Sequence, residues 1–180
     1  IFTIPVSATL SNGCSASDNI VINNDSKIWN TASTNWNSAN WKPSTALPAS
    51  DKCVIIKTPV IVGWGTDGDA RSVKVEAGGK LTIQNGGSLK IQNDLNNAAS
   101  ATDVVIESDG NLIQVNEGIN INTGTITAKR ILNLSTGRQQ YNYLISPLED
   151  QSLKNIYTLA GATAPVVLYH NEASNTFGTS

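Results

Sequence analysis

The sequence predicts an all-β chain whose middle third winds as a parallel β-solenoid, and two observations support this prediction. The stretch "EAGGKLTIQNGGSLKIQND", residues 76–94, places an apolar pair every eight residues, and Gly or Asn follows each pair. Apolar and polar residues alternate within each pair, as in a β-strand, and Gly and Asn tolerate the left-handed backbone of a tight corner. The chain also resembles itself at a shift of 31 residues (107 minus 76), which aligns Glu76 with Glu107.

Strands of about three residues do not form stable hairpins alone, but they can stack when the chain winds as a coil. We expect three short strands per turn of roughly two dozen residues, with apolar side chains inside, over residues 51–130. An antiparallel sandwich with strands every eight to twelve residues is the alternative, and the short strands and the repeat favour the coil. The expected inward positions are Val54/Ile56, Val60/Val62, Val73/Val75, Leu81/Ile83, Leu89/Ile91, Val104/Ile106, Leu112 with Ile113 or Val115, and Ile119/Ile121.

The two ends of the chain differ from this middle part. A solenoid needs its open ends covered, and three tryptophans within residues 29–41 are candidates to plug the first turn. Residues 1–50 are therefore predicted to hold a strand pair followed by a Trp-rich cap. Residues 131–180 read as the start of a second β-rich unit that is truncated, and the Met-free chain as a processed or excised piece of a longer protein. Within it, Ser146, Pro147 and Glu149 fit the start of a short helix at 147–156.

The composition excludes several classes of function. Charged residues make up 14% of the chain, against roughly 25% in an average domain, and the net charge is −2 without a run of Lys or Arg. Nucleic-acid binding rests on clustered cations, so it is not expected. No apolar stretch approaches the roughly 18 residues that span a bilayer. An amide-rich, Lys-poor composition suits a secreted or cell-surface protein, in which Cys14 and Cys53 would form a disulfide; two reduced thiols are the alternative.

Two groups of residues are candidate binding sites. An indole face can stack on a pyranose ring, so Trp29, Trp36, Trp41 and Trp64 could form a carbohydrate-binding platform instead of a structural plug. Asp67 and Asp69, in "GTDGD", suggest a calcium site. A calcium ion needs six to eight oxygen ligands, which this pair does not supply alone. Calcium is the one cofactor that the sequence suggests.

Catalytic residues are harder to find. If the 31-residue shift is one turn of the coil, Glu76 and Glu107 lie one strand spacing apart, about 4.8 Å, and paired acids can cleave glycosidic bonds. Solvated corner residues offset by Lys80 are the favoured interpretation, because no Arg, His or aromatic cleft accompanies the pair. His170 is the only histidine, and we expect it on the surface without a catalytic triad.

Several segments resemble a known module. These are "WNTASTNWNSANWKP", "PASDKCVIIKTPVIV", "SVKVEAGGKLTIQNGGSLKIQNDL" and the later "TAKRILN" and "YNYLISPL". Over most of residues 28–150 the chain is similar to the short β-helix modules of large, adhesin-like bacterial surface proteins exported by type IX secretion. The resemblance implies a right-handed parallel β-helix and no catalytic residue. Cys53, where the pattern usually has Asp or another small residue, and Tyr141, where Trp is common, depart from it.

The expected function is therefore a non-enzymatic structural or adhesive module of a secreted or cell-surface bacterial protein. It would act as a spacer or assembly unit, with neighbouring domains of the same polypeptide, copies of itself or other surface proteins as partners. A carbohydrate-binding module that uses exposed tryptophans is the first alternative, and glycans are then the partners. A fragment of a polysaccharide-degrading enzyme is the second.

Overall fold

The computed structural model describes residues 2–9, 11–13, 15–22, 25–116, 122–131 and 168–179. The chain forms two compact units, Ile1–Ile131 and Leu132–Ser180. The described residues are almost entirely strands and turns, with one short 3₁₀ helix, η1 (Ala101–Asp103), and no α-helix among them. The helix expected at 147–156 lies outside the described residues.

Each unit contains an antiparallel hairpin. In the first unit, β1 (Phe2–Thr9) pairs with β2 (Ser15–Ile22), as expected for this part of the chain. In the second unit, β14 (Leu168–Asn171) pairs with β15 (Thr176–Thr179).

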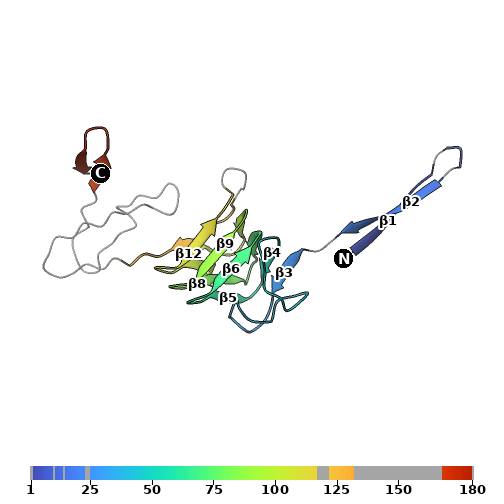
Figure 1. Ribbon diagram of the computed structural model, residues 1–180, viewed down its shortest axis with the longest axis horizontal. Helices are drawn as coiled ribbons and strands as arrows, with labels where there is room; N and C mark the ends of the chain where they lie inside the picture. Colours follow the sequence, from blue (N-terminus) through green and yellow to red (C-terminus); the bar gives the residue numbers. More distant parts are fainter. Residues whose placement is uncertain are drawn as a thin grey trace. The chain divides into compact units, whose positions relative to one another are not determined.

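The rest of the first unit is a parallel β-solenoid with three sheets (Figure 1). The first sheet contains β3 (Ser26–Trp29), β4 (Cys53–Ile56), β7 (Ser72–Val75) and β10 (Leu95–Asn97). The second sheet contains β5 (Pro59–Val62), β8 (Lys80–Ile83), β11 (Val104–Ile106) and β13 (Thr127–Ala128). The third sheet contains β6 (Asp67–Ala70), β9 (Ser88–Ile91) and β12 (Asn111–Gln114).

Successive strands along the chain pass to successive sheets, so three strands make one turn. The turns are β4–β5–β6, β7–β8–β9 and β10–β11–β12, and every strand pair in the three sheets is parallel. Figure 1 shows β6, β9 and β12 side by side in this arrangement. The predicted solenoid is confirmed, and the antiparallel sandwich is wrong for this segment.

The stacking register differs from the one that the sequence repeat suggests. Leu81 pairs with Val104, 23 residues later (104 minus 81), and Leu89 pairs with Leu112, also 23 residues later. The 31-residue shift is therefore one turn plus one eight-residue side of the coil. It carries Leu81 of β8 onto Leu112 of β12, which belongs to a different sheet. The expectation that residues 31 apart lie one above the other is wrong, because all three sides carry the same strand–corner pattern and a self-alignment cannot distinguish them.

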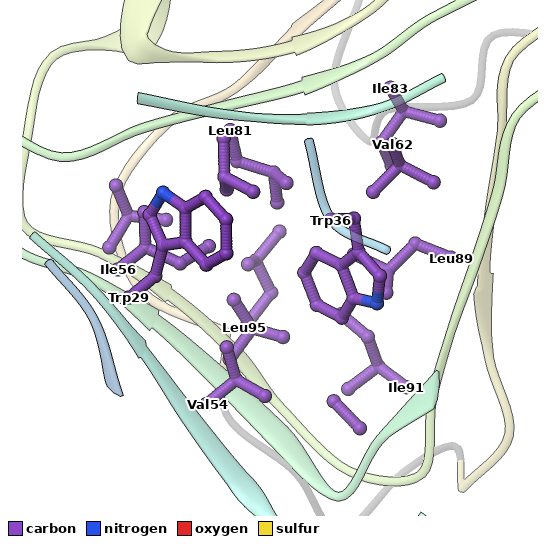
Figure 2. Packing of buried hydrophobic residues seen from close by; sticks show 14 of the residues in the cluster. Trp29, Trp36, Val54, Ile56, Val62, Leu81, Ile83, Leu89, Ile91 and Leu95 are labelled. Carbon is purple, nitrogen blue, oxygen red and sulfur yellow. The ribbon is translucent and has the colours of Figure 1, made fainter. Parts of the chain in front are cut away.

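Alternating side chains of all three sheets point into one apolar interior. Figure 2 shows residues of the first sheet (Val54, Ile56), the second (Leu81, Ile83) and the third (Leu89) directed toward one another. All of these side chains are at most 1% exposed. Burial of apolar area at roughly 25 cal/mol per Å² is the main contribution that holds such short strands together.

Glycine pairs form the corners between sides. After β7, the Gly79 N–H donates to the Glu76 carbonyl at 2.8 Å, and Gly78 has φ +88°, a left-handed conformation that Gly adopts without strain. Gly79 is required for a second reason, since a Cβ there would overlap the Ile56 carbonyl oxygen of the turn below. The sequence "GG" thus combines a sharp corner with close stacking.

The tryptophan segment covers the start of the coil, as predicted. The Trp36 N–H donates to the Ile61 carbonyl at 3.0 Å, which adds residues 34–36 to the second sheet before β5. The ring of Trp41 lies 4.9 Å from the rings of both Trp29 and Trp36, and its Nε1 donates to the Trp36 carbonyl at 2.9 Å. The Trp29 and Trp36 rings lie among the aliphatic core residues (Figure 2).

A buried amide fixes the corner after β10. Asn97 is 4% exposed, and its Nδ2 donates to the carbonyls of Ser100 at 2.9 Å and Thr125 at 2.6 Å, while its Oδ1 accepts from the Ala99 N–H at 3.0 Å. Asn97 therefore joins the chain leaving the first sheet to the chain that returns one turn later. Several of the chain's many asparagines have this kind of role in place of a larger core.

We expect Asn97→Ala to lower the free energy of unfolding by about 2 kcal/mol, because buried carbonyls lose their donor. Urea denaturation of the full chain measures the loss. Asn85→Ala is the matched control, since Asn85 is exposed and makes a single side-chain bond, to Asp109 at 3.3 Å. Equal, small losses for both variants would contradict the role assigned to Asn97.

Candidate functional site

Three of the four tryptophans are unavailable to a ligand. Trp29, Trp36 and Trp41 are at most 1% exposed and pack on one another and on the core. An indole buried in this way offers no free ring face to a sugar. The structure thus places these three candidate binding residues in the cap.

Trp64 is different, because 82% of it is exposed. It lies at the corner after β5, between Gly63 and Gly65, where the Thr66 N–H donates to the Gly63 carbonyl at 3.0 Å and closes a tight turn. The Gly65 N–H donates to the Gly86 carbonyl of the next turn at 2.9 Å, and a Cβ at Gly86 would overlap the Trp64 Cδ1 atom. One edge of the indole therefore rests on the Gly86 backbone while the rest of the ring faces solvent.

A shallow depression of about 270 Å³ lies beside this indole. Apart from Trp64 and Gly63, its lining comes from the second sheet and from the rung that precedes it. None of the lining residues is charged, and both hydroxyl and amide groups line it. The lining residues are Thr34, Asn35, Ile61, Gly63, Trp64, Thr66 and Gln84.

Two side-chain amides of the lining differ in their bonds. The Asn35 Oδ1 accepts from the Asn37 N–H at 2.9 Å, which fixes the orientation of that side chain. Gln84 is exposed, its Oε1 lies close to Gly63, and within the described part of the chain its amide makes no hydrogen bond. Sequence reasoning identified Trp64 but missed these amides. The 23-residue register would have found Gln84, because it places the corner at Gln84 above the corner at Gly63.

Asp67 and Asp69 lie two residues apart on β6 and face outward on the same side. Their neighbours on β9 are Ser88 and Lys90. In the described ranges, no three His, Cys, Asp or Glu side chains come together in a way that could hold a metal ion. The calcium site stays a prediction with two acidic residues and a lysine as its known surroundings.

Glu76 and Glu107 are not stacked neighbours, which corrects the expectation that rested on the 31-residue shift. The Glu76 N–H donates to the Ile56 carbonyl, whereas the Glu107 N–H donates to the Ile83 carbonyl, so the two corners belong to different sheets. Each carboxylate has its own cation. Glu76 pairs with Lys57 and Lys74, both at 3.5 Å, and Glu107 pairs with Lys129 at 2.8 Å.

Cys53 lies at the start of β4 as a free thiol. Its Sγ accepts a hydrogen bond from Arg71 Nη2 at 3.1 Å, and this bond raises the pKa of the Arg71 guanidinium. Cys14 lies outside the described residues, so the disulfide between Cys14 and Cys53 stays a prediction.

Shifted pKa values of the remaining groups arise from exposed pairs. A hydrogen bond from Lys52 at 2.6 Å lowers the pKa of Asp51, and the same bond raises the pKa of Lys52. Hydrogen bonds from the hydroxyl and N–H of Ser100 lower the pKa of Asp103 beside η1. None of these groups lines the depression beside Trp64.

His170 lies on β14 in the second unit and is exposed, as expected. Its Nε2 is 3.0 Å from the Asn175 Oδ1, and its ring lies 5.0 Å from that of Phe177. These contacts belong to the hairpin itself.

Comparisons with known proteins give a family. In the described segments, no helix is long and apolar enough to cross a membrane. No curated protein and no solved structure matches the chain. A family model described as a domain of unknown function (DUF8693) matches residues 28–179, and the chain therefore belongs to this family.

Proposed function

We propose that the chain is a non-enzymatic structural module that spaces, displays or links neighbouring domains of a secreted or cell-surface bacterial protein. The observation that carries this proposal is the continuous stacking of parallel rungs around one closed apolar core. Each rung adds about 4.8 Å, so the first sheet, with four strands, fixes a separation of roughly 14 Å between its outer strands. Neighbouring rungs share main-chain hydrogen bonds, so the separation does not depend on flexible side chains.

The polar side chains of the coil support the same role. Among the described residues, every buried side-chain nitrogen or oxygen has a hydrogen-bond partner. Asn97 illustrates the pattern, because its amide is used entirely to hold one corner. Polar groups that are fully used by the fold rigidify it. The cell-surface location rests on the resemblance to modules of bacterial proteins exported by type IX secretion.

Spin labels can test the rigidity that a spacer needs. In a full chain with Cys14→Ser and Cys53→Ser, labels at Lys42→Cys and Thr125→Cys mark the cap and the last turn; both sites are exposed. We expect one narrow distance distribution in electron–electron double resonance, and broadening only in urea that unfolds the chain. A broad or multiple distribution in native buffer would contradict a spacer.

The enzyme alternative has its own test. Glu76 and Glu107 lie at corners of different sheets, and each is paired with lysine. We therefore expect no release of reducing sugar from a polysaccharide. Release that Glu107→Gln abolishes would contradict the non-enzymatic part of the proposal.

A further inference from the structure

We infer that Trp64 and the depression beside it form a binding subsite for a neutral carbohydrate, specifically a β-linked oligosaccharide whose pyranose hydroxyls are equatorial. This inference goes beyond the spacer role and does not rest on it, because a rigid spacer needs no ligand. It follows from the exposure of Trp64, from the support of its ring and from the chemistry of the lining.

The exposure of Trp64 has no structural explanation in the coil. Its three counterparts close the core, whereas Trp64 is 82% exposed at a corner where the turn itself needs no aromatic residue. Isolated exposed apolar residues are common, but a tryptophan beside a polar depression is less so. The ring also has a defined support, because its Cδ1 edge packs on Gly86 of the next turn. An indole held at one edge keeps a face available at low entropic cost.

The lining selects the ligand class by its charge. The absence of charged residues among the seven lining side chains disfavours phosphate, nucleic acid and acidic or basic peptides. Hydroxyl and amide groups from Thr34, Asn35 and Gln84 can instead exchange hydrogen bonds with sugar hydroxyls. A flat aromatic face beside such groups matches a pyranose, whose equatorial hydroxyls leave apolar C–H faces above and below the ring.

The side chains differ in what they can offer. Thr66 is 6% exposed, and its Oγ1 accepts from Asn37 Nδ2 at 3.2 Å, so it contributes mainly to the floor. Gln84 is exposed, and no described residue bonds to its amide, so both donors and the acceptor are free for a ligand. Gln84 is therefore the residue that we assign to recognition of sugar hydroxyls, with Trp64 as the stacking platform.

The volume limits the size of the ligand. At about 270 Å³ the depression is just below the roughly 300–1,000 Å³ of sites that enclose drug-sized molecules. It suits one or two sugar rings, so we expect a dissociation constant on the order of 1 mM for a short oligosaccharide. Tight binding would need several such modules on one polypeptide.

Titration of the ¹⁵N-labelled full chain with cellotetraose tests the subsite. We expect saturable shifts of the Trp64 indole N–H and the Gln84 side-chain amide, while the indole signals of the buried Trp29 and Trp41 stay unchanged. Cellotetraose should also protect the accessible tryptophan fluorescence from acrylamide, because Trp64 is the exposed indole. Glycerol at the same hydroxyl concentration should produce neither effect.

Variants complete the test. Trp64→Ala should abolish saturable binding, Trp64→Phe should retain part of it, and Gln84→Ala should weaken it about fivefold through the lost hydrogen bonds. Phe177→Ala removes an aromatic residue that is 58% exposed in the other unit and should bind as the wild type does. Circular dichroism should show that each variant is folded. Binding by Trp64→Ala within twofold of the wild type, equal effects of glycerol, or no saturable shift with the wild type would each overturn the subsite.

Discussion

Trp41→Ala should lower the free energy of unfolding by about 3–5 kcal/mol, the usual cost of removing a large buried aromatic side chain. Trp41 is 0% exposed, and its ring lies between those of Trp29 and Trp36 at 4.9 Å from each. The substitution removes both ring contacts and also the hydrogen bond from Nε1 to the Trp36 carbonyl. The loss is a large fraction of the 5–15 kcal/mol that stabilises a typical domain. Urea denaturation followed by circular dichroism measures it.

Trp64→Ala is the matched control, because it removes the same side chain from an exposed corner. Its effect on stability should stay within about 0.5 kcal/mol. Limited proteolysis gives a second measure, since a damaged cap should expose the chain between Trp29 and Trp41 to cleavage before the coil unfolds. If Trp41→Ala proved as mild as Trp64→Ala, the tryptophans would not be closing the coil.

The cap and the coil could be predicted from the sequence because each leaves a local signal. Pairs such as Leu81 and Ile83 alternate with polar residues, and Gly78 and Gly79 mark the corner, so strand, turn and inward face are all encoded within eight residues. The clustering of tryptophans before the first regular turn likewise predicted that they close it. These features depend on neighbours in the sequence, where local chemistry decides the outcome.

The register and the candidate site could not be predicted in the same way. Each side of the coil repeats the same pattern, so a shift of one turn plus one side scores as well as a shift of one turn, and Glu76 was matched to the wrong partner. Trp64 follows Val62 by two residues, and strand alternation continued through it would place it inside. The turn that joins Gly63 to Thr66 ends the strand and directs the indole outward. Gln84 lies beside it only because of stacking between turns.

The stacking distance itself can be tested at a corner. Gly79→Ala should lower the free energy of unfolding by about 3 kcal/mol, since overpacking against a backbone that cannot move costs this much or somewhat more. The added Cβ would overlap the Ile56 carbonyl oxygen and lie 2.9 Å from the Ile56 carbonyl carbon. The Ile56 carbonyl cannot move away freely, because it accepts the Glu76 N–H at 3.0 Å and so takes part in holding the two turns together.

Gly63→Ala is the control for this substitution, because Gly63 is also a corner glycine but its added Cβ would meet only the Gln84 Oε1, at 3.5 Å, an ordinary contact. Its stability should change by less than about 0.5 kcal/mol. Hydrogen exchange distinguishes a local from a global effect. Gly79→Ala should speed exchange at Glu76 and in the strands on both sides of the corner, because separating two rungs weakens every bond between them. Similar denaturation curves for Gly79→Ala and Gly63→Ala would mean that the turns are not in direct backbone contact, and the coil would then lack the fixed spacing on which its proposed role depends.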